Sequence, residues 1–453
     1  MKTWLPTVAA IVLAGCSVPE DAGFEDVRKP AEERTAKKVH WFRGGPEDAE
    51  VRRTIDELFS RELTSESVVQ IALLNNPELQ SHYEDLGVAQ ADLVQAGILS
   101  NPTIFGSAHF PTRPGVVTGM DFEIAQNFLD LLMIPARKEV ASMEFERVKF
   151  HVVDDVIEMA ARAKVAWLEV VAAQQRAEVR HAIAAAAEAQ ADLAARLKDA
   201  GNLSELAASR ERDQSESSKM AWVKAEEQVS EARENLTVIL GAWGTQVAWT
   251  APKKLPDMPG TEIALNGLES LAIARRLDLA AARRERDASV ERLDLVKAFR
   301  WLGTVELGFD AHRELEPEVG WAYGPSLALS LPIFDRQQAA IFALEAELRR
   351  RESTNRDLAI RIRSEVRSAR ERLLTHRRKA EHLQRVVIPL RERIVELALR
   401  EYNFMLIGVA EVLRARQEEY DAYDESIEMV RDYWIARAEL ERAVGGRLPG
   451  EKK

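Results

Sequence analysis

Two pairs of carboxylates lie close enough in the sequence to suggest acid–base chemistry. Asp121 and Glu123 are separated by one residue, and Glu306 and Asp310 by three. Paired carboxylates can act as a general acid and a general base. All four, however, stand in stretches where polar and apolar residues alternate, and alternate residues of a β-strand point to the same face. The pattern therefore favours acids that line a water-filled pore over a catalytic pair.

No other residues have the spacing of a catalytic or metal site. Gly324-Pro325-Ser326 lacks the Gly-x-Ser-x-Gly pattern of a nucleophile elbow. The histidines are scattered without the short spacings of metal ligands: His40, His82, His109, His151, His181, His312, His376 and His382. We therefore predict that the protein is not an enzyme and has no cofactor and no metal site.

The composition is that of a folded and largely helical protein. Hydrophobic residues make up 46% of the 453 positions, which is enough for a large core and excludes general disorder. Alanine, glutamate, leucine and arginine dominate the middle of the chain, as they do in long helices. The net charge of −12 argues against a nucleic-acid partner.

Four β-strands are predicted, in two pairs. Residues 304–312 alternate strictly between apolar and polar side chains, and the alternation returns in 321–331 until Pro332 ends it. Residues 103–110 and 119–129 form an earlier pair of the same kind. Strands with one apolar and one polar face, placed between long helices, indicate one arc of a barrel on a helical stalk.

Long helices follow each strand pair. We expect a helix over 136–200 that returns as 203–240, and a second hairpin over 337–400 and 409–444. A helix of about 65 residues is ~100 Å long at ~1.5 Å per residue.

The two halves of the chain form an internal repeat. Glu205 and Arg210 each lie 206 residues before a residue of the same type, Glu411 and Arg416. The predicted segments are a first repeat over 62–241, a connector over 242–267, a second repeat over 268–446 and a tail over 447–453.

The N-terminus has the features of a signal peptide, predicted over 1–15. Its apolar run at 8–13 is too short to span a bilayer. Leu13-Ala14-Gly15-Cys16 resembles the bacterial lipobox, which implies lipidation of Cys16; an ordinary signal peptide with an incidental cysteine is the alternative. Residues 16–61 would then tether the lipid to the folded body, either freely or packed against it.

Three motifs resemble those of a known family. They are Asn75-Asn76-Pro77-Glu78-Leu79, the run 324–335 that ends in Leu-Pro-Ile-Phe-Asp, and Tyr-Asn-Phe-Met-Leu-Ile-Gly at 402–408. In their order and spacing the chain is similar to the outer-membrane efflux protein (TolC-like) family, in its lipoprotein branch. The resemblance implies a mainly α fold with a membrane β-barrel portion. In this TolC-like fold three protomers build one 12-stranded barrel on an α-helical periplasmic tunnel.

The resemblance also implies a function and partners. A homotrimer in the outer membrane of a Gram-negative bacterium would join a periplasmic adaptor (membrane fusion) protein and an inner-membrane pump. It would pass small molecules or metal cations outward. The exit duct of a type I protein secretion system is an alternative within the channel class. A lipid-anchored coiled-coil tether is an alternative from another class, but a tether needs no amphipathic strands.

The predicted faces of the strands agree with a trimeric barrel, because four strands cannot close a barrel alone. The acids Asp121, Glu123, Glu306 and Asp310 would meet water. The residues expected to meet lipid are Leu307, Phe309, Leu327 and Leu329, with Trp321 and Tyr323 in an interfacial girdle.

The turns of the helical hairpins are the candidate periplasmic gate. The family's acidic positions imply that Glu205 and Glu411 form acidic rings at the mouth, although acids at a helix start also stabilise the helix alone. Arg210, Arg414 and Arg416 are near enough in sequence to pair with them. Arg414 stands where family members often carry a second acid.

Overall fold

The computed structural model describes residues 19, 21–110, 112, 118–262, 266–314 and 320–449. The chain divides into two compact units, which are described separately. The first comprises Met1–Glu25, Glu84–His151 and Asp278–Leu358, and the second Asp26–Tyr83, Val152–Leu277 and Ala359–Lys453. Cys16 and the predicted signal peptide lie outside the described residues.

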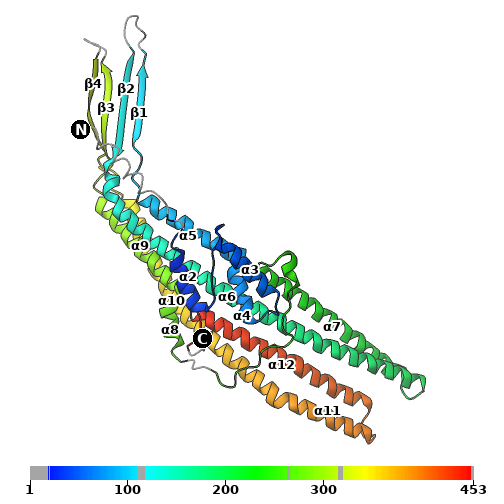
Figure 1. Ribbon diagram of the computed structural model, residues 1–453. Coiled ribbons are helices and arrows are strands. Elements are labelled where there is room, and N and C mark those ends of the chain that lie inside the picture. The colour runs from blue at the N-terminus through cyan, green and yellow to red at the C-terminus, as the bar shows by residue number, and fades with distance from the viewer. Residues whose placement is uncertain are drawn as a thin grey trace. The chain divides into compact units, whose positions relative to one another are not determined.

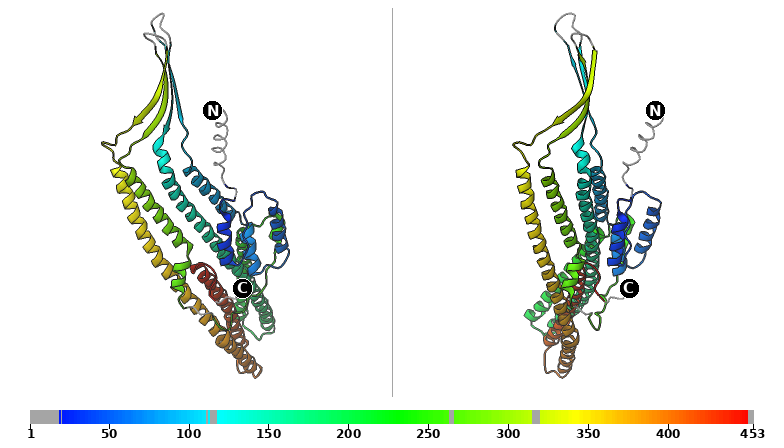
Figure 2. Two further views of the ribbon diagram at one scale, coloured as in Figure 1. Left: turned by 60° about the vertical axis from the view of Figure 1, so that its left-hand side comes forward. Right: turned by 90° about the vertical axis from the view of Figure 1, so that its left-hand side faces the viewer.

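The first unit contains one four-stranded antiparallel sheet. Its strands are β1 (Thr103–His109), β2 (Gly119–Asn127), β3 (Val305–Glu314) and β4 (Gly320–Leu329). They pair in the order β1-β2-β3-β4 and lie side by side in Figures 1 and 2. The two predicted strand pairs are therefore confirmed, and the β2–β3 pairing joins the two halves of the chain into one sheet.

The strands and helices begin and end differently in the two halves. β2 stops at Asn127, two residues before the predicted end, because the Asn127 side chain accepts a hydrogen bond from the Leu129 backbone N–H (3.0 Å) and starts a helix. Helix α6 therefore begins at Phe128 and contains Pro135 within it. The corresponding run in the second half is neither helix nor strand, and α10 begins only at Gln338.

The long helices form the predicted hairpins. α6 (Phe128–Asp199) returns as α7 (Glu205–Ile239), and the second hairpin consists of α10 (Gln338–His382), α11 (Ile388–Asn403) and α12 (Val409–Ala443). The helix predicted over 337–400 is observed, but it is not α-helical throughout. A π-helical turn, Leu383–Val387, precedes Pro389. Because proline has no N–H to donate and its ring clashes with the preceding turn, a widened turn at this point relieves the conflict.

The N-terminal segment from Asp26 onward belongs to the second unit and is packed within it. It contains α2 (Phe24–Thr35) and α3 (Glu47–Phe59). Val27, Ala31 and Ile55 from these helices are buried. Of the two forms of tether that the sequence allowed, the ordered one is observed.

The connector is held by bonds to the second hairpin. The Trp434 Nε1–H donates to the carbonyl oxygen of Pro256 (2.9 Å). Arg377 and Arg437 both pair with Glu262, at 3.2 and 3.1 Å. Apart from a short 3₁₀ helix at Gly244–Ala248, the described connector residues 242–262 form no helix or strand.

The Asn-Asn-Pro motif joins two helices to the end of a third. α4 (Ser65–Asn75) starts with a capping box between Thr64 and Ser67, and α5 (Pro77–Ala96) follows Asn76 directly. Asn76 Nδ2 donates to the Ile239 carbonyl (2.8 Å), while its Oδ1 accepts from the Leu79 N–H (3.1 Å).

The residue before Asn76 completes this joint. Asn75 Nδ2 donates to the carbonyl oxygens of Leu240 (2.8 Å) and Gly241 (3.0 Å), which α7 leaves without partners at its end. Gly241 has φ +61°, and a Cβ there would lie 2.6 Å from the Asn75 carbonyl oxygen. The joint therefore needs both asparagines and this glycine.

The second repeat builds the same joint with different residues. α8 (Leu268–Arg275) meets α9 (Leu277–Phe299) beside the end of α12, where Gly445 (φ +79°) lies against the Arg275 backbone. No asparagine stands there. Arg34, from α2, donates to the carbonyl oxygens of Arg275 (2.7 Å) and Gly445 (3.5 Å). Arg34 of the N-terminal segment thus links the end of α8 to the end of α12.

We predict that Asn76→Ala destabilises the protein by about 1–3 kcal/mol, because a buried carbonyl and an N–H each lose a partner. Thermal unfolding followed by circular dichroism measures the change. Asn235→Ala, at an exposed position of α7, is the matched control and should leave the midpoint unchanged or slightly higher. Equal midpoints for both variants would contradict the role given to the motif.

Candidate functional site

The four predicted pore-lining acids lie on one face of the sheet. In the β2–β3 register Glu123 is opposite Asp310, and Asn127 is opposite Glu306. Asp121 is two residues from Glu123, so it projects from the same face. Opposite positions of an antiparallel pair share a face, and the acids therefore gather into one polar surface.

Two histidines belong to the same surface. His312 is opposite Asp121 in the register and lies 3.4 Å from the Asp310 carboxylate. His109, at the end of β1, lies 3.2 Å from Asp121. The alternation over 304–312 already assigned His312 to this polar face, whereas His109 was considered only as one of the scattered histidines. Among the described residues no group of three or more histidine, cysteine or acidic side chains could hold a metal ion.

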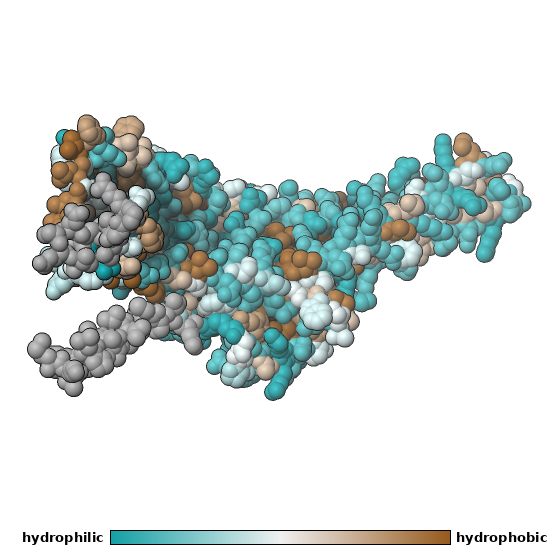
Figure 3. Space-filling view, turned by 90° about the horizontal axis from the view of Figure 1, so that it is seen from above, coloured by the Kyte–Doolittle hydropathy of each residue, from teal (hydrophilic) through white to brown (hydrophobic). Residues whose placement is uncertain are grey.

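The opposite face of the sheet is apolar and uncovered. Leu307 is opposite Leu327, and the rings of Phe309 and Tyr323 lie 6.3 Å apart. The side chains expected to meet lipid are about half exposed: Leu307 46%, Phe309 49%, Leu327 61% and Leu329 56%. Figure 3 shows hydrophobic side chains gathered over the sheet, at the left of the view. None of the helices in the described residues is both long and apolar enough to cross a membrane.

The hairpin turns place the gate candidates at helix starts. Ser204 caps α7 by accepting from the Ala207 N–H (3.2 Å), so Glu205 is the first residue of that helix. Glu411 lies in the first turn of α12, after the cap residue Gly408. Both acids are exposed, as is Arg210. Each turn therefore presents a carboxylate where a helix N-terminus stabilises negative charge.

The arginines near the second turn have different partners. Arg414 lies 3.5 Å from Glu411, and both side chains are more than half exposed. Arg416 instead binds Glu419 (2.5 Å), whose side chain is only 8% exposed. Of these two arginines only Arg414 faces the acid at the turn, because residues three apart share a helix face and residues five apart do not.

A charged cluster between α6 and α12 was not found from the sequence. Arg176 Nε and Arg180 donate to the Asp424 carboxylate at 2.9 and 2.7 Å, and Arg176 also pairs with Glu428 (2.8 Å). The Asp424 side chain is only 7% exposed. Burial acts to raise its pKa, but the hydrogen bonds and charges of the two arginines outweigh burial, so the pKa of Asp424 is lowered. The hydrogen bond to Asp424 also raises the pKa of Arg176.

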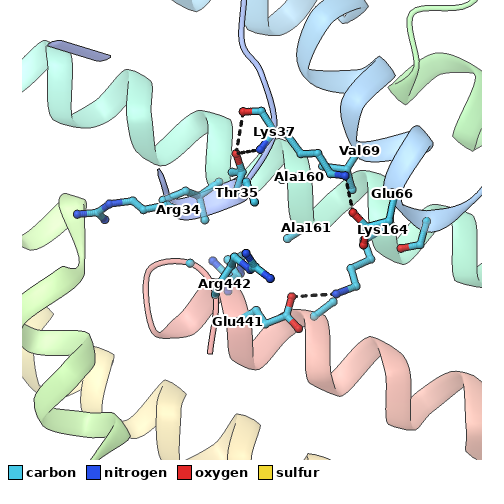
Figure 4. A pocket seen from close by; sticks show the side chains of 16 residues that line it. Arg34, Thr35, Lys37, Glu66, Val69, Ala160, Ala161, Lys164, Glu441 and Arg442 are labelled. Atoms are coloured by element: carbon cyan, nitrogen blue, oxygen red, sulfur yellow. Dashed lines mark hydrogen bonds and ion pairs between the residues drawn. The ribbon is translucent and has the colours of Figure 1, made fainter. Parts of the chain in front are cut away.

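A polar cavity of about 290 Å³ lies beside α2, α4, α6 and the end of α12 (Figure 4). Lys37 pairs with Glu66, and Lys164 lies 2.9 Å from Glu441. The hydrogen bond from Lys37, opposed by burial, lowers the pKa of Glu66. Both lysines are paired with acids of the protein itself. We therefore interpret the cavity as a packing interface of the N-terminal segment and not as a ligand site.

The second half of the chain matches a known family. Residues 268–446 match the sequence model described as outer membrane efflux protein. The chain carries an outer membrane efflux protein domain. No curated protein matches the chain.

Solved structures share the fold over most of the chain, including much of the part outside this domain. The outer-membrane channel CmeC of Campylobacter jejuni has a TM-score of 0.73 at 15% identity, over 87% of each chain. The outer-membrane channel OprN has a TM-score of 0.71 at 18% identity, over 92% of this chain and 95% of its own. CusC, whose structures describe transmembrane channel formation, has a TM-score of 0.71 at 14% identity, over 85% and 93%.

These comparisons confirm the predicted TolC-like fold class and the resemblance on which it rested. The family named by the matching model is one of efflux channels and not of enzymes, which agrees with the prediction that the chain does no catalysis. At these identities the solved structures establish the fold of this chain and not its substrate.

We predict that Asp424→Asn lowers the free energy of unfolding by about 1.5–3 kcal/mol above pH 4, because hydrogen bonds to a charged group are lost. The folded-state pKa lies below the unfolded value of about 3.9, so the stabilisation is present above pH ~4 and is lost as the pH falls further. The difference between wild type and variant should therefore shrink below pH 4 in denaturant unfolding.

Asp421→Asn is the matched control on the same helix. Asp421 is 54% exposed and lies 3.7 Å from Arg180, so its loss should change stability by less than about 1 kcal/mol. An Asp424→Asn effect that is as small as this, or that is unchanged down to pH 2, would count against the assigned ion pair.

Proposed function

We propose that this chain is the outer-membrane channel of a tripartite efflux system, which exports small molecules or metal cations from the periplasm or an inner-membrane pump to the exterior. The observation that carries the proposal is the four-stranded sheet, with one uncovered apolar face, one acidic face and two unpaired edges. A water-soluble protein would bury an apolar sheet face of this size.

The sheet has the dimensions of a membrane arc but not those of a closed barrel. β3 and β4 each have 10 residues, and a membrane strand needs about 9–11. The outer edges of β1 and β4 have no strand partner among the described residues. Edges of this kind cannot face lipid, because their N–H and C=O groups would lack partners. Pairing β4 of one copy with β1 of the next, three times, closes the barrel.

The polar face would then line the lumen. Asp121, Glu123, Glu306 and Asp310 from three copies give an acidic wall, which attracts cations. The exposed acids Glu205 and Glu411 would place further negative charge at the periplasmic mouth, where an adaptor protein would dock.

Replacing both Glu205 and Glu411 by glutamine should shift the reversal potential in a salt gradient towards less cation selectivity. An unchanged reversal potential would contradict the acidic mouth.

The lipid anchor is proposed from the sequence alone. Lipidation of Cys16 would hold the segment before α2 at the membrane that contains the barrel. Mass spectrometry of the mature N-terminus tests it, and an unmodified residue 16 in wild-type protein would exclude the anchor.

Two other functions are compared with the structure: one fits it less well, and the other fits it equally well. A coiled-coil tether would use the helical hairpins but not the amphipathic sheet, which therefore disfavours it. A protein-secretion exit duct would use the same barrel and differs only in the pump that it serves.

We predict that Leu307→Arg prevents membrane assembly, whereas Ser326→Arg permits it. An arginine on the lipid face of such a barrel costs roughly 2–4 kcal/mol at the bilayer midplane, while a lumen position stays hydrated. Ser326 is opposite Gly308 on the polar face. It is the neighbour of Leu327, which is opposite Leu307 on the apolar face. The measurement is the fraction of each variant that assembles in the outer-membrane fraction, and equal fractions would refute the assigned faces.

A further inference from the structure

Two arginines lie against one tryptophan at the helical end of the sheet. The guanidinium carbons of Arg300 and Arg336 are 5.1 and 5.0 Å from the ring centroid of Trp301. Trp301 just precedes β3 and Arg336 follows β4, and Trp301 is 56% exposed. Contacts at this distance are cation–π interactions, which hold both cations beside an amphipathic ring.

The chain fixes this end of the sheet firmly. Ser330 and Thr304 exchange hydrogen bonds: the Thr304 N–H donates to Ser330 Oγ (2.6 Å), and the Ser330 N–H donates to the Thr304 carbonyl (3.0 Å). Gly303 lies so close to the Ser330 carbonyl that any side chain would collide with it. Trp301 is therefore two residues from a rigid point and not on a loose loop.

Apolar side chains surround the arginines. A cavity of about 620 Å³ is bordered by both arginines and Trp301, and by apolar residues from the segment before α10 and from α10 itself. Ile333 is 60%, Phe334 92% and Phe342 68% exposed. A soluble protein seldom leaves such a patch open, so this one calls for an apolar partner.

The positive charge of the site is not neutralised by the protein. Within the described part of the chain, neither guanidinium forms an ion pair. Glu345, in the cavity wall, pairs with Lys297 (2.7 Å), and Asp335 accepts from the Gln337 N–H (2.8 Å) rather than from a guanidinium. The site therefore combines an apolar surface with two available cations.

The place of the site along the strands matches a membrane boundary. Trp321, at the other end of the sheet, is opposite Arg313. From Val305 to Arg313 the strand is about 26 Å long at ~3.3 Å per residue, which is ~20 Å along the membrane normal at the ~40° tilt of such barrels, and Trp301 lies four residues further along the chain. The apolar band of an outer-membrane barrel is about 25 Å tall, with aromatic residues at both borders. If Trp321 lies at one border, Trp301 lies at the level of the headgroups on the other.

We propose that Arg300, Trp301 and Arg336 bind the headgroup of an anionic phospholipid in the inner leaflet of the outer membrane. The phosphate would accept hydrogen bonds from the guanidiniums, and an acyl chain would cover Phe334 and Phe342. A phospholipid fits both parts of the site, whereas a free phosphate ion would leave the apolar patch uncovered. The inference rests on the proposed function, which places the sheet in a bilayer.

The test compares lipid retention by wild type, Arg300→Gln/Arg336→Gln and the control Arg349→Gln/Arg350→Gln. The control makes the same change in charge at exposed positions of α10 outside the cavity. Each protein is taken from nanodiscs of phosphatidylcholine with a minor share of phosphatidylglycerol, and native mass spectrometry counts the retained phosphatidylglycerol. We expect roughly 30-fold weaker retention by the double variant, from two basic residues at an anionic surface, and wild-type retention by the control.

Single-channel recording of the same proteins in the same lipids separates the two claims. If the double variant conducts and retains phosphatidylglycerol like wild type, the lipid site is wrong while the channel stands. If wild type neither inserts nor conducts, the proposed function fails and the lipid site with it. Displacement of the lipid by an equal concentration of inorganic phosphate would overturn the choice of a phospholipid.

Discussion

Unpaired backbone groups at the edges of one sheet constrain the rest of this protein. Among the described residues the four strands bury neither face and leave the edges of β1 and β4 open. In a bilayer each unpaired N–H or C=O would cost several kcal/mol, so the sheet is stable there only when copies of the chain complete it. Only in a closed barrel does the acidic face line a lumen while the apolar face and the aromatic residues at both ends contact lipid.

The duplicated helical framework uses one type of joint twice. In the first repeat Asn75 and Asn76 bond the carbonyls at the end of α7, and Gly241 allows the close approach. In the second repeat the carbonyls of Arg275 and Gly445 are bonded by Arg34 from the N-terminal segment. The segment between the proposed lipid anchor and the body is therefore part of the framework. Loss of this segment would remove the donor to the carbonyls of the second joint. Loss of the asparagines would do the same to the first joint.

The sequence predicted those features that depend on local periodicity. Strict alternation gave the two strand pairs and the faces of Asp121 and Leu307, since a period of two assigns each residue to a side. It did not show α2, because Pro30 lies inside that helix and suggested a break. The Asp424 cluster could not be predicted from the sequence for another reason. Arg176 and Asp424 are 248 residues apart, and only the packing of α6 against α12 brings them together. His312 was assigned to the acidic face by the alternation, whereas His109 was missed although its position two residues from Ser107 places it there.

Barrel closure is tested most directly by cross-linking β1 of one copy to β4 of another. Adjacent antiparallel strands hold Cα atoms about 4.5–5.5 Å apart, within the reach of a disulfide. Ser107→Cys on β1 is combined in turn with a cysteine at Ala322, Ser326 or Ala328 on the same face of β4. A closed trimer predicts that at least one pair gives a disulfide-linked trimer on a non-reducing gel, while each single cysteine variant runs as a monomer. Membrane-inserted protein that gives no linked trimer with any pair would contradict closure through these edges.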